Sequence, residues 1–522
     1  MMGSIDFVFL CSFTVSVIWA ASLSPKTIED SDPGFDLYMG YDNLEEYDNH
    51  PIQFDHPLPD WLKGSLIRNG VGRYEVGNRK VENLLDGFAK ITKWTFPGDG
   101  TTSFSTKFLR TSFYNESMSS NDIAPYATLG PLDPPFTLEE TLKALENGMD
   151  NPNVNVYNFT ENIVVLYDLW IMYNIDPRTL NLQEKINADV PNAKMGFPYA
   201  SPISCAHPLQ EIGTEHHLTF LGSLALLPGL KHKLTLVRVK SSTDREMIAQ
   251  WEVENMPYMH SFSVTKKYAI FLGSPYFYEI QRMLKNLNMA DTMVWYPDKP
   301  TMIYLVELST GKVQTLQTEC MFTMHHINAF EMDDQHIAVD VSDFGEAGVF
   351  SRASVEVIRN QTLRNSLLKS QPVIKRYILN LKDNTVDVMK FPSPARLPFS
   401  SNFDLPTINE KYRGKEYCFV YGFSAMIDGI NYSNSSIVKK DMCKNTTDRA
   451  WFMKHHYLME AWFVPFPQGT AEDDGYLLTP VLDGENRKSY LAVIDARNMT
   501  LVNKAELPTT VPFNIHGRLF DL

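Results

Sequence analysis

The sequence predicts an all-β fold in which β-hairpins repeat around an axis, a β-propeller. Hairpin-like strand pairs recur over several hundred residues, and few helical segments separate them. A regular alternation of strands and helices, which would indicate a parallel α/β sheet, does not occur. The spacing of the repeat is too irregular to count blades, and two β-sandwich domains are the alternative that the same strands allow.

Each repeated unit consists of an apolar strand, a turn containing Asp, Asn, Ser or Gly, and a second strand that begins with Thr or Val. A weaker copy begins at Leu234, and the four clear copies are Trp170–Leu180, Ile303–Val313, Tyr377–Val386 and Tyr490–Leu501. Irregular spacing implies long insertions between the blades. Two candidates for such insertions are Phe136–Met149 and Tyr278–Met289, and the charged residues of the first are typical of a helix.

Composition indicates a large globular protein and excludes nucleic acid as a partner. The chain has 522 residues, of which 44% are hydrophobic and 21% charged, so it can bury a sizeable core. A length prior of about 150 residues per domain would suggest three or four domains, but a repeat fold can absorb the whole chain. With 47 Lys and Arg against 62 Asp and Glu, the net charge is -15, which repels a phosphate backbone.

The N-terminus predicts a secretory signal peptide over residues 1–22. Phe7–Ala21 is an apolar run that is followed by a small residue, Ser22, and it is too short to span a bilayer. The preceding residues carry Asp6 and no Lys or Arg, which is unusual for such a signal. We therefore expect residues 23–522 to form one propeller domain in the secretory lumen or outside the cell.

Glycosylation sequons and cysteines are consistent with that compartment. Five Cys occur, and Cys11 lies in the predicted signal, which leaves an even number for an oxidising environment. Cys418 and Cys443 are the favoured pair because a polar loop separates them; four unpaired thiols are the alternative. The chain has seven Asn-x-Ser/Thr sites, at Asn115, Asn158, Asn360, Asn431, Asn434, Asn445 and Asn498.

Four of the 13 His stand in strand-like or tightly turned contexts, whereas the others mostly lie beside polar residues. These four are His207, His260, His325 and His516. Any one of them alone is more simply a core imidazole bonded to the backbone. Strands of different blades converge on a propeller axis, so the four together predict a metal centre. Imidazole suits Fe, Zn, Cu and Ni, and four neutral ligands leave coordination positions open on an octahedral ion.

At these histidines the sequence resembles the carotenoid cleavage oxygenase family, from about Asp36 to Leu522. The shared motifs around and beyond them are Pro59–Gly70, Leu85–Ala89, Glu472–Gly475 and Pro512–Gly517. The resemblance implies a seven-bladed propeller with helical and loop insertions capping one face. It also implies one Fe(II) on the axis, held by His207, His260, His325 and His516. Dioxygen would be the co-substrate that cleaves a conjugated double bond of a carotenoid or apocarotenoid, with or without isomerisation.

The resemblance further implies carboxylates that orient three of the four ligands, and here the chain departs from the family. The matching positions are Asp168, Asp404 and Glu460, whereas the family carries glutamate at all three. Aspartate is one methylene shorter, so we expect its carboxylate to fall short of the imidazole by about an ångström unless backbone or water closes the gap. An ordinary turn residue is the alternative interpretation of each aspartate.

Two apolar segments with basic edges, Leu224–Lys231 and Pro275–Lys285, match the family's membrane-facing entrance. They predict a peripheral contact with a membrane or a lipid carrier that delivers a hydrophobic polyene. Packing of both segments on the propeller face is the alternative. Aromatic residues that could line a polyene tunnel, or belong to the core instead, are Trp170, Phe262, Tyr276, Phe277 and Trp462.

Two other functions remain open at the level of the sequence. One is a secreted carrier of a polyene or other lipid on the same fold with reduced or lost activity, which the two aspartates and the signal favour. The other is a propeller for protein–protein interaction, in which the four histidines are structural or bind Zn. Iron content separates the oxygenase from the carrier. The oligomeric state is not predicted.

Overall fold

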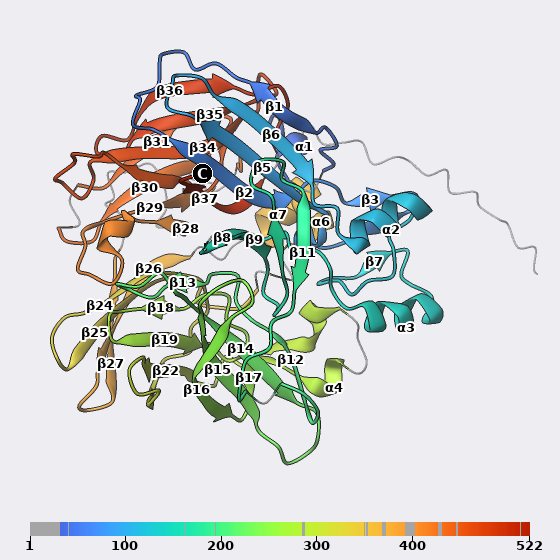
Figure 1. Cartoon of the computed structure of the whole chain (residues 1–522), viewed down its shortest axis with the longest axis vertical. Coiled ribbons are helices and arrows are strands. Elements are labelled where there is room, and N and C mark those ends of the chain that lie inside the picture. The colour runs from blue at the N-terminus through green and yellow to red at the C-terminus, as the bar shows by residue number, and fades with distance from the viewer. Residues whose placement is uncertain are drawn as a thin grey trace, which may run out of the picture. The chain divides into compact units, whose positions relative to one another are not determined.

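Seven antiparallel sheets of four or five strands account for most of the chain in the computed structural model (Figure 1). They are the blades of a propeller, so the predicted fold class is confirmed, and the two-sandwich alternative is excluded. The structure describes residues 32–39, 41–160, 162–193, 195–283, 288–348, 350, 353–367, 372–391, 402–425, 431–444, 447–511 and 513–522. The predicted signal peptide lies outside this range.

Blade 1 joins strands from the two ends of the described chain. Strand β37 pairs antiparallel with β2, with Asn69 opposite His516 and Arg68 opposite Gly517. In Figure 1 the blue strands of this blade lie beside the red β37. In spatial order its strands are β1 (Tyr47–Pro51), β6 (Ser103–Phe108), β5 (Ala89–Phe96), β2 (Gly64–Val71) and β37 (Asn514–Phe520).

Blades 2 to 4 follow in chain order. Blade 2 consists of β8 (Asn155–Phe159), β9 (Asn162–Leu166), β10 (Met172–Ile175) and β11 (Leu182–Ile186). Blade 3 consists of β12 (Tyr199–Ile203), β13 (Leu209–Gln210), β14 (His217–Ala225), β15 (His232–Val239) and β16 (Arg245–Val253). Blade 4 consists of β18 (Ser263–Val264), β19 (Tyr268–Gly273), β22 (Thr301–Glu307) and β23 (Val313–Thr318).

Blades 5 to 7 complete the ring. Blade 5 consists of β24 (Thr323–Glu331), β25 (His336–Asp343), β26 (Val373–Asn380) and β27 (Thr385–Lys390). Blade 6 consists of β28 (Asp404–Thr407), β29 (Phe419–Ser424), β30 (Ser436–Asp441) and β31 (Arg449–Phe452). Blade 7 consists of β32 (His456–Leu458), β33 (Trp462–Pro465), β34 (Gly475–Asp483), β35 (Lys488–Asp495) and β36 (Thr500–Glu506).

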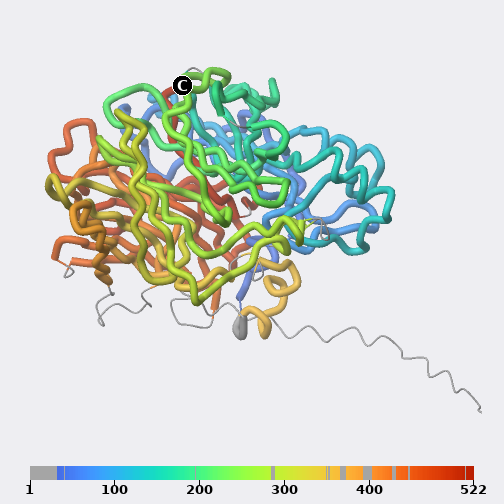
Figure 2. Tube along the Cα trace, turned by 90° about the horizontal axis from the view of Figure 1, so that it is seen from below, coloured from blue at the N-terminus to red at the C-terminus, as the bar shows by residue number. Residues whose placement is uncertain are grey.

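Insertions between strands carry the helices and two small sheets. One small sheet contains β3 (Glu75–Val76), β4 (Arg79–Val81) and β7 (Leu132–Asp133), and the other β17 (Met256–Pro257), β20 (Tyr276–Tyr278) and β21 (Met293–Trp295). Seen from below, the segment around α2 and α3 projects at one edge (Figure 2). The α-helices are α1 (Phe35–Tyr38), α2 (Ser112–Ser120), α3 (Leu138–Asn147), α4 (Ile280–Met283), α6 (Val355–Arg359) and α7 (Gln361–Leu367). Short 3-10 turns are η1 (Leu84–Asp86), η2 (Met289–Thr292) and η3 (Glu410–Tyr412).

All five predicted hairpins are present, and each forms the outer two strands of a blade. Each hairpin pairs two consecutive strands antiparallel: β10 with β11, β15 with β16, β22 with β23, β26 with β27, and β35 with β36. Outer strands are half exposed, as in β27, whose burial alternates between intermediate and exposed. Because these strands are half exposed, their sequences alternate apolar and polar residues and are joined by polar turns, the pattern by which a hairpin is recognised.

The helix predicted within Phe136–Met149 is α3. Thr137 accepts a hydrogen bond from the Glu140 backbone, and the Glu140 side chain bonds back to Thr137, a capping box that fixes where the helix begins. The second predicted insertion, Tyr278–Met289, lies between strands β19 and β22 of blade 4. Tyr278 ends strand β20, and among the described residues only Ile280–Met283 is α-helical there.

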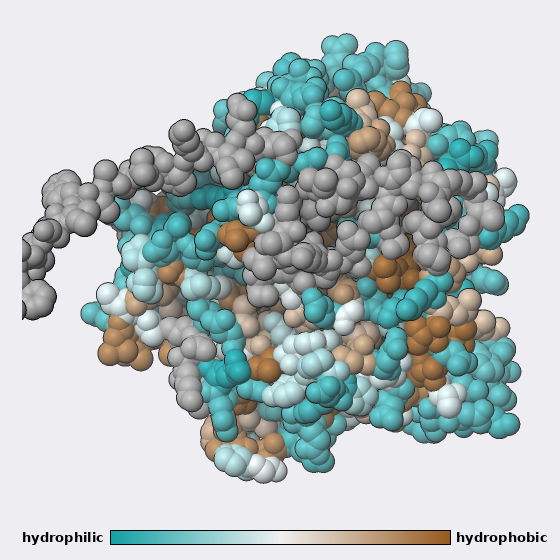
Figure 3. Space-filling view, turned by 180° about the vertical axis from the view of Figure 1, so that it is seen from behind, coloured by the Kyte–Doolittle hydropathy of each residue, from teal (hydrophilic) through white to brown (hydrophobic). Residues whose placement is uncertain are grey.

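Cys418 and Cys443 form a disulfide in blade 6, which confirms the favoured pair. Cys205 and Cys320 are free thiols in the described chain. No helix among the residues that the structure describes has the length and apolar character needed to cross a membrane. On the face shown in Figure 3, hydrophobic residues are interspersed with hydrophilic ones.

Candidate metal centre

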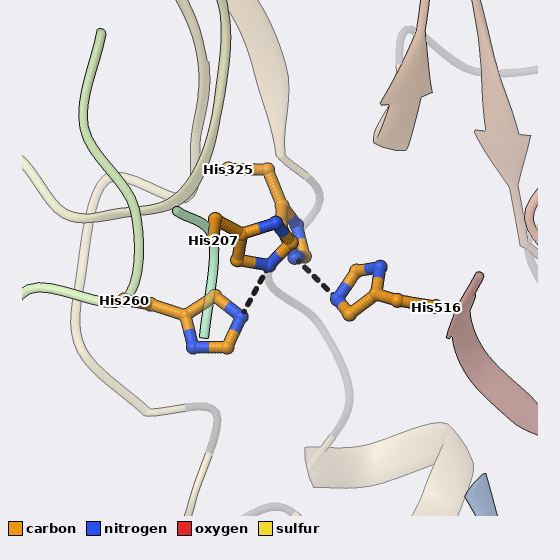
Figure 4. Close-up of side chains that lie close together, drawn as sticks. All are labelled: His207, His260, His325 and His516. Atoms are coloured by element: carbon orange, nitrogen blue, oxygen red, sulfur yellow. Dashed lines mark hydrogen bonds between the residues drawn. The ribbon is translucent and has the colours of Figure 1, made fainter. Parts of the chain in front are cut away.

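The four predicted histidines meet on the propeller axis, and each comes from a different blade (Figure 4). His207 stands between β12 and β13, His260 just before β18, His325 within β24 and His516 within β37. One ring nitrogen of each lies within 4.8 Å of the corresponding nitrogens of the others. His326, the neighbour of His325, is outside this tetrad, because its Nδ1 lies 2.7 Å from the hydroxyl of Ser263.

The Nε2 atoms of the tetrad face one another. His207 Nε2 lies 3.0 Å from His260 Nε2, and His325 Nε2 lies 3.2 Å from His516 Nε2. Three of the rings are buried, and His207 is partly buried. Ligand atoms from four distant segments therefore converge on a space of the size that one metal ion occupies.

Three of the four rings bind a carboxylate through the opposite nitrogen, Nδ1. His260 Nδ1 is 2.9 Å from Asp168 Oδ2, and His516 Nδ1 is 2.8 Å from Glu460 Oε1. His325 Nδ1 is 2.7 Å from Asp404 Oδ1. Asp168 belongs to blade 2, Asp404 to blade 6 and Glu460 to blade 7, so every blade supplies one residue to the centre.

Neither aspartate falls short of its histidine, because both make direct hydrogen bonds, as expected where the backbone closes the gap. We attribute this to the backbone at each position. The carbonyl of Asp168 accepts from the Ser204 amide at 3.0 Å, which ties the residue to blade 3 beside His207. Asp404 starts a strand whose register is irregular, and the next residue, Leu405, has a φ of 50°. The hydrogen bond at Asp168 and the distortion at Asp404 set the backbone position from which each shorter side chain reaches its ring.

The carboxylates determine the protonation of the rings. A carboxylate accepts a hydrogen, so it holds the proton on Nδ1 and leaves the lone pair of Nε2 directed at the centre. Burial lowers the pKa of His207 and His516 well below the ordinary value, and the other imidazoles of the tetrad add to this. Neutral imidazoles whose lone pairs face one another repel unless a cation lies between them. The donor set therefore fits a divalent transition-metal ion.

His207 is the exception, because no carboxylate among the described residues binds its ring. Its Nδ1 lies 3.4 Å from the amide nitrogen of Asn155, a weak contact. That amide also donates to the carbonyl of Ala206 at 3.0 Å, next to His207 in the chain. Asn155 thus holds the backbone that carries His207 more firmly than it holds the ring.

Two residues that support the carboxylates were not predicted from the sequence. Tyr258 donates a 2.7 Å hydrogen bond to Asp168 Oδ2, and the Ala206 amide donates to Asp168 Oδ1 at 3.0 Å. One carboxylate thereby fixes the ring of His260 and the segment that leads into His207. Tyr258 could have been found from the sequence, because it stands two residues before the ligand His260.

Arg68 is the second missed residue. It is fully buried on β2, and its Nη1 lies 3.6 Å from Glu460 Oε2. Burial raises the pKa of Glu460 to about 7, and the positive charge of Arg68 opposes this rise. Burial would also raise the pKa of Asp404, but its interaction and hydrogen bond with His325 bring it below its ordinary value. Arg68 therefore helps to keep the partner of His516 ionised.

Two cavities reach the tetrad, and they differ in character. The first has a volume of about 110 Å³, contacts His260, His325 and His516, and is lined mainly by apolar and aromatic side chains. The second, of about 450 Å³, contacts His207, His325 and His516 and has many polar and charged side chains in its wall. The tetrad separates an apolar space from a polar one.

The aromatic residues of the apolar cavity are not the ones considered from the sequence. Among the described residues, the wall of the apolar cavity contains none of the five aromatic residues considered from the sequence, Trp170, Phe262, Tyr276, Phe277 and Trp462. Phe262 and Trp462 line the polar cavity instead. The aromatic residues of the apolar cavity are Phe113, Tyr167, Tyr258, Tyr278 and Phe350. These come from insertions and inter-blade segments, whose position relative to the axis no local sequence pattern reveals.

Asp86 shapes one wall of the apolar cavity. Its two carboxylate oxygens accept hydrogen bonds from the amides of Leu129 at 2.6 Å and Gly130 at 2.7 Å. Burial raises the pKa of Asp86 to about 7. Because both oxygens accept these hydrogen bonds, Asp86 holds the insertion around Leu129 in place beside the apolar cavity.

A seven-bladed propeller whose axis carries four imidazoles and three oriented carboxylates defines a class of metal-dependent enzyme, and comparison with known proteins gives the family. A family model described as retinal pigment epithelial membrane protein matches residues 42–521. The chain belongs to this family of carotenoid oxygenases, which are oxidoreductases.

Individual relatives match along almost their whole length. The carotenoid isomerooxygenase of Galleria mellonella is 27% identical, covering 93% of this chain and 96% of that protein. The apocarotenoid-15,15'-oxygenase of Synechocystis is 25% identical over 95% and 98% of the two chains. The human beta,beta-carotene 15,15'-dioxygenase is 24% identical over 92% and 94%.

Solved structures show the same fold. Cobalt-substituted Synechocystis ACO superimposes with a TM-score of 0.77 at 23% identity, covering 94% of this chain and 98% of that chain. An ACO/RPE65 chimera gives a TM-score of 0.75 at 22% identity, covering 94% and 98%.

Substituting Asp404→Asn should weaken divalent metal binding by about 10- to 100-fold. The substitution keeps the shape of the side chain but removes the charge that holds the proton on His325 Nδ1. Affinity for Co(II) is measured by competition with a chromogenic chelator. Asp383→Asn, in an exposed turn, is the matched control and should bind as the unsubstituted protein does. Equal affinities for both variants would contradict a role for Asp404 in the centre.

Proposed function

We propose that this protein is a non-heme Fe(II)-dependent dioxygenase that cleaves a conjugated double bond of a carotenoid or apocarotenoid, with or without isomerisation. The proposal rests above all on one observation. A member of the carotenoid oxygenase family retains four converging imidazoles, three of them bonded to a carboxylate. Relatives named as carotene and apocarotenoid oxygenases support the substrate class.

His207, His260, His325 and His516 would hold the iron, one ion per chain. When bound, Fe(II) would supply open coordination positions and the redox chemistry needed to use dioxygen as co-substrate. The protein's own contribution is orientation. Asp168, Asp404 and Glu460 keep three rings in the tautomer that presents Nε2, and four neutral ligands leave the charge of the ion uncompensated in the inner sphere.

The apolar cavity would bind the polyene. Its aromatic wall can stack on a conjugated chain, and apolar burial excludes water from the reacting double bond. About 110 Å³ holds only part of a long polyene, so wall side chains must move when the substrate enters. Four methionines in the wall, whose unbranched side chains adapt readily, suit that movement: Met149, Met289, Met293 and Met324.

Iron content and polyene bleaching test the proposal on one preparation. The protein purified after anaerobic Fe(II) loading should contain one equivalent of iron, and polyene absorbance should fall only when dioxygen is present. His260→Ala should lose both iron and bleaching, because it removes one of four ligands. His336→Ala, at an exposed histidine paired with Asp333, should keep both. A protein that binds polyene but takes up no iron would refute the oxygenase and leave a lipid carrier on this fold.

We also propose that the protein contacts a membrane or lipid carrier through an apolar patch at the tip of the β14–β15 hairpin. Leu226, Leu227 and Leu230 are 44%, 45% and 42% exposed, and Phe197 is 79% exposed. The Leu226 amide binds the Pro198 carbonyl at 3.0 Å, which joins the two loops into one patch. By contrast, Tyr276–Tyr278 in the second predicted segment is buried as strand β20.

Replacing Leu226 and Leu227 together by Asp should lower the affinity for phosphatidylcholine vesicles at least about tenfold, because apolar area no longer enters the lipid. Co-sedimentation with the vesicles measures it. Met332→Asp, a matched change at a side chain that is 50% exposed, should leave vesicle binding unchanged. Unchanged binding by the double variant would place any lipid contact elsewhere.

We also propose that the protein resides in the secretory lumen or outside the cell. The Cys418–Cys443 disulfide supports this, since such bonds persist in oxidising compartments. The sequon residues Asn115, Asn360 and Asn498 are exposed, as glycosylation requires; Asn445 lies outside the described residues.

Full-length protein expressed in animal cells should appear in the medium or in the secretory lumen. Treatment with an N-glycosidase should increase its electrophoretic mobility. Asn498→Gln should remove one step of that shift, because it deletes one exposed acceptor. Protein recovered only from the cytosol, with no change after glycosidase, would refute the localisation.

A further inference from the structure

The polar cavity on the axis contains an arginine that the metal centre does not use. This cavity of about 450 Å³ begins at His207, His325 and His516 and continues between the loops around Gly213 and Arg413. Arg518 lies in its wall, on β37, two residues after His516. The residue is partly buried, and its positive charge acts on His207, whose pKa it helps to lower.

Aromatic rings hold the Arg518 guanidinium by its faces. The guanidinium carbon is 3.8 Å from the ring centroid of Tyr157 and 5.4 Å from that of Trp462. Stacking of this kind engages the π faces of the group and leaves its N–H donors, which lie in the plane, free to bind a ligand. Across the part of the chain that the structure describes, Arg518 makes no ion pair, and no side chain or backbone oxygen accepts from it.

The carboxylates that share the cavity are already engaged. Glu410 forms a two-point pair with Arg413, at 2.6 and 3.1 Å. Glu460 binds His516 Nδ1 at 2.8 Å and the Gly517 amide at 3.2 Å. Lys411 and Lys415 add exposed positive charge at the wall. Arg518 interacts electrostatically with Glu410 and Glu460 but forms an ion pair with neither. A partly desolvated cation whose N–H donors are not engaged by a carboxylate can bind an anion in a polar cavity.

We propose that the axial cavity binds a small carboxylate anion, which pairs in the plane of the Arg518 guanidinium. The planar fork of arginine matches the two oxygens of a carboxylate, which gives this class an advantage over chloride. The anion would enter from the polar side of the tetrad, opposite the apolar cavity. This inference depends only on the residues of the polar cavity and holds whether or not the proposed oxygenase function is correct.

Acetate is the probe, and the full-length protein is titrated in a buffer free of carboxylates. Isothermal titration calorimetry measures affinity, and tryptophan fluorescence reports on Trp462 beside the guanidinium. Saturable binding of acetate is expected, and Arg518→Met should weaken it by about tenfold or more, because a charged two-point hydrogen bond is lost. Arg178→Met, at a side chain that is 91% exposed, is the matched control and should bind acetate normally.

Two further variants keep the test decisive. Arg518→Lys retains the charge without the planar fork, so it should bind acetate more weakly than the unsubstituted protein even if Arg518→Met does not fold. Trp462→Phe should reduce the fluorescence change while calorimetric binding persists. Absence of saturable acetate binding, equal binding by Arg518→Lys, or chloride binding as tight as acetate would each overturn the proposal. Iron content plays no part in these measurements, so failure here is distinguishable from failure of the proposed function.

Discussion

The pairing of β2 with β37 is the interaction on which the centre depends. It closes the ring of blades with strands from the two ends of the described chain, and it places His516 opposite Asn69. The same pairing brings Arg68 beside Glu460, the carboxylate that orients His516. Closure of the fold and completion of the ligand set are therefore one event, because a propeller left open at blade 1 would lack both a metal ligand and the charge that supports its partner.

Each of the seven blades supplies one side chain to the centre. Blades 1, 3, 4 and 5 supply imidazoles, and blades 2, 6 and 7 supply carboxylates. Asp168 reaches from blade 2 to His260 in blade 4, and along the way it binds the backbone next to His207 in blade 3. The hydrogen bond between Asp168 and His260 thus ties two non-adjacent blades together through their side chains. The shorter aspartates remain effective because the backbone, rather than the side chain, spans the remaining distance.

What the sequence could predict follows from where each residue lies. Outer hairpins such as β26–β27 alternate in exposure and have polar turns, so five of them were recognised. Inner strands are mostly buried, and some are very short, as Ser263–Val264 is, so they carry no such pattern. The number of blades therefore came from the family resemblance. The tetrad was predictable from four short strings. The reach of Asp404 and the wall of the apolar cavity were not, because both depend on local backbone distortions and on contacts between blades.

The order of the ligands along the chain has a consequence for biosynthesis. His207, His260 and His325 lie on blades 3 to 5, whereas His516 lies on the strand synthesised after all other strands of the described propeller. A chain growing from its N-terminus can thus assemble three of the four ligands long before the fourth exists. The complete set of four imidazoles, with the carboxylate that orients His516, therefore exists only once the last strand has been made. Completion of the tetrad and closure of the ring of blades thus fall at the same point of synthesis.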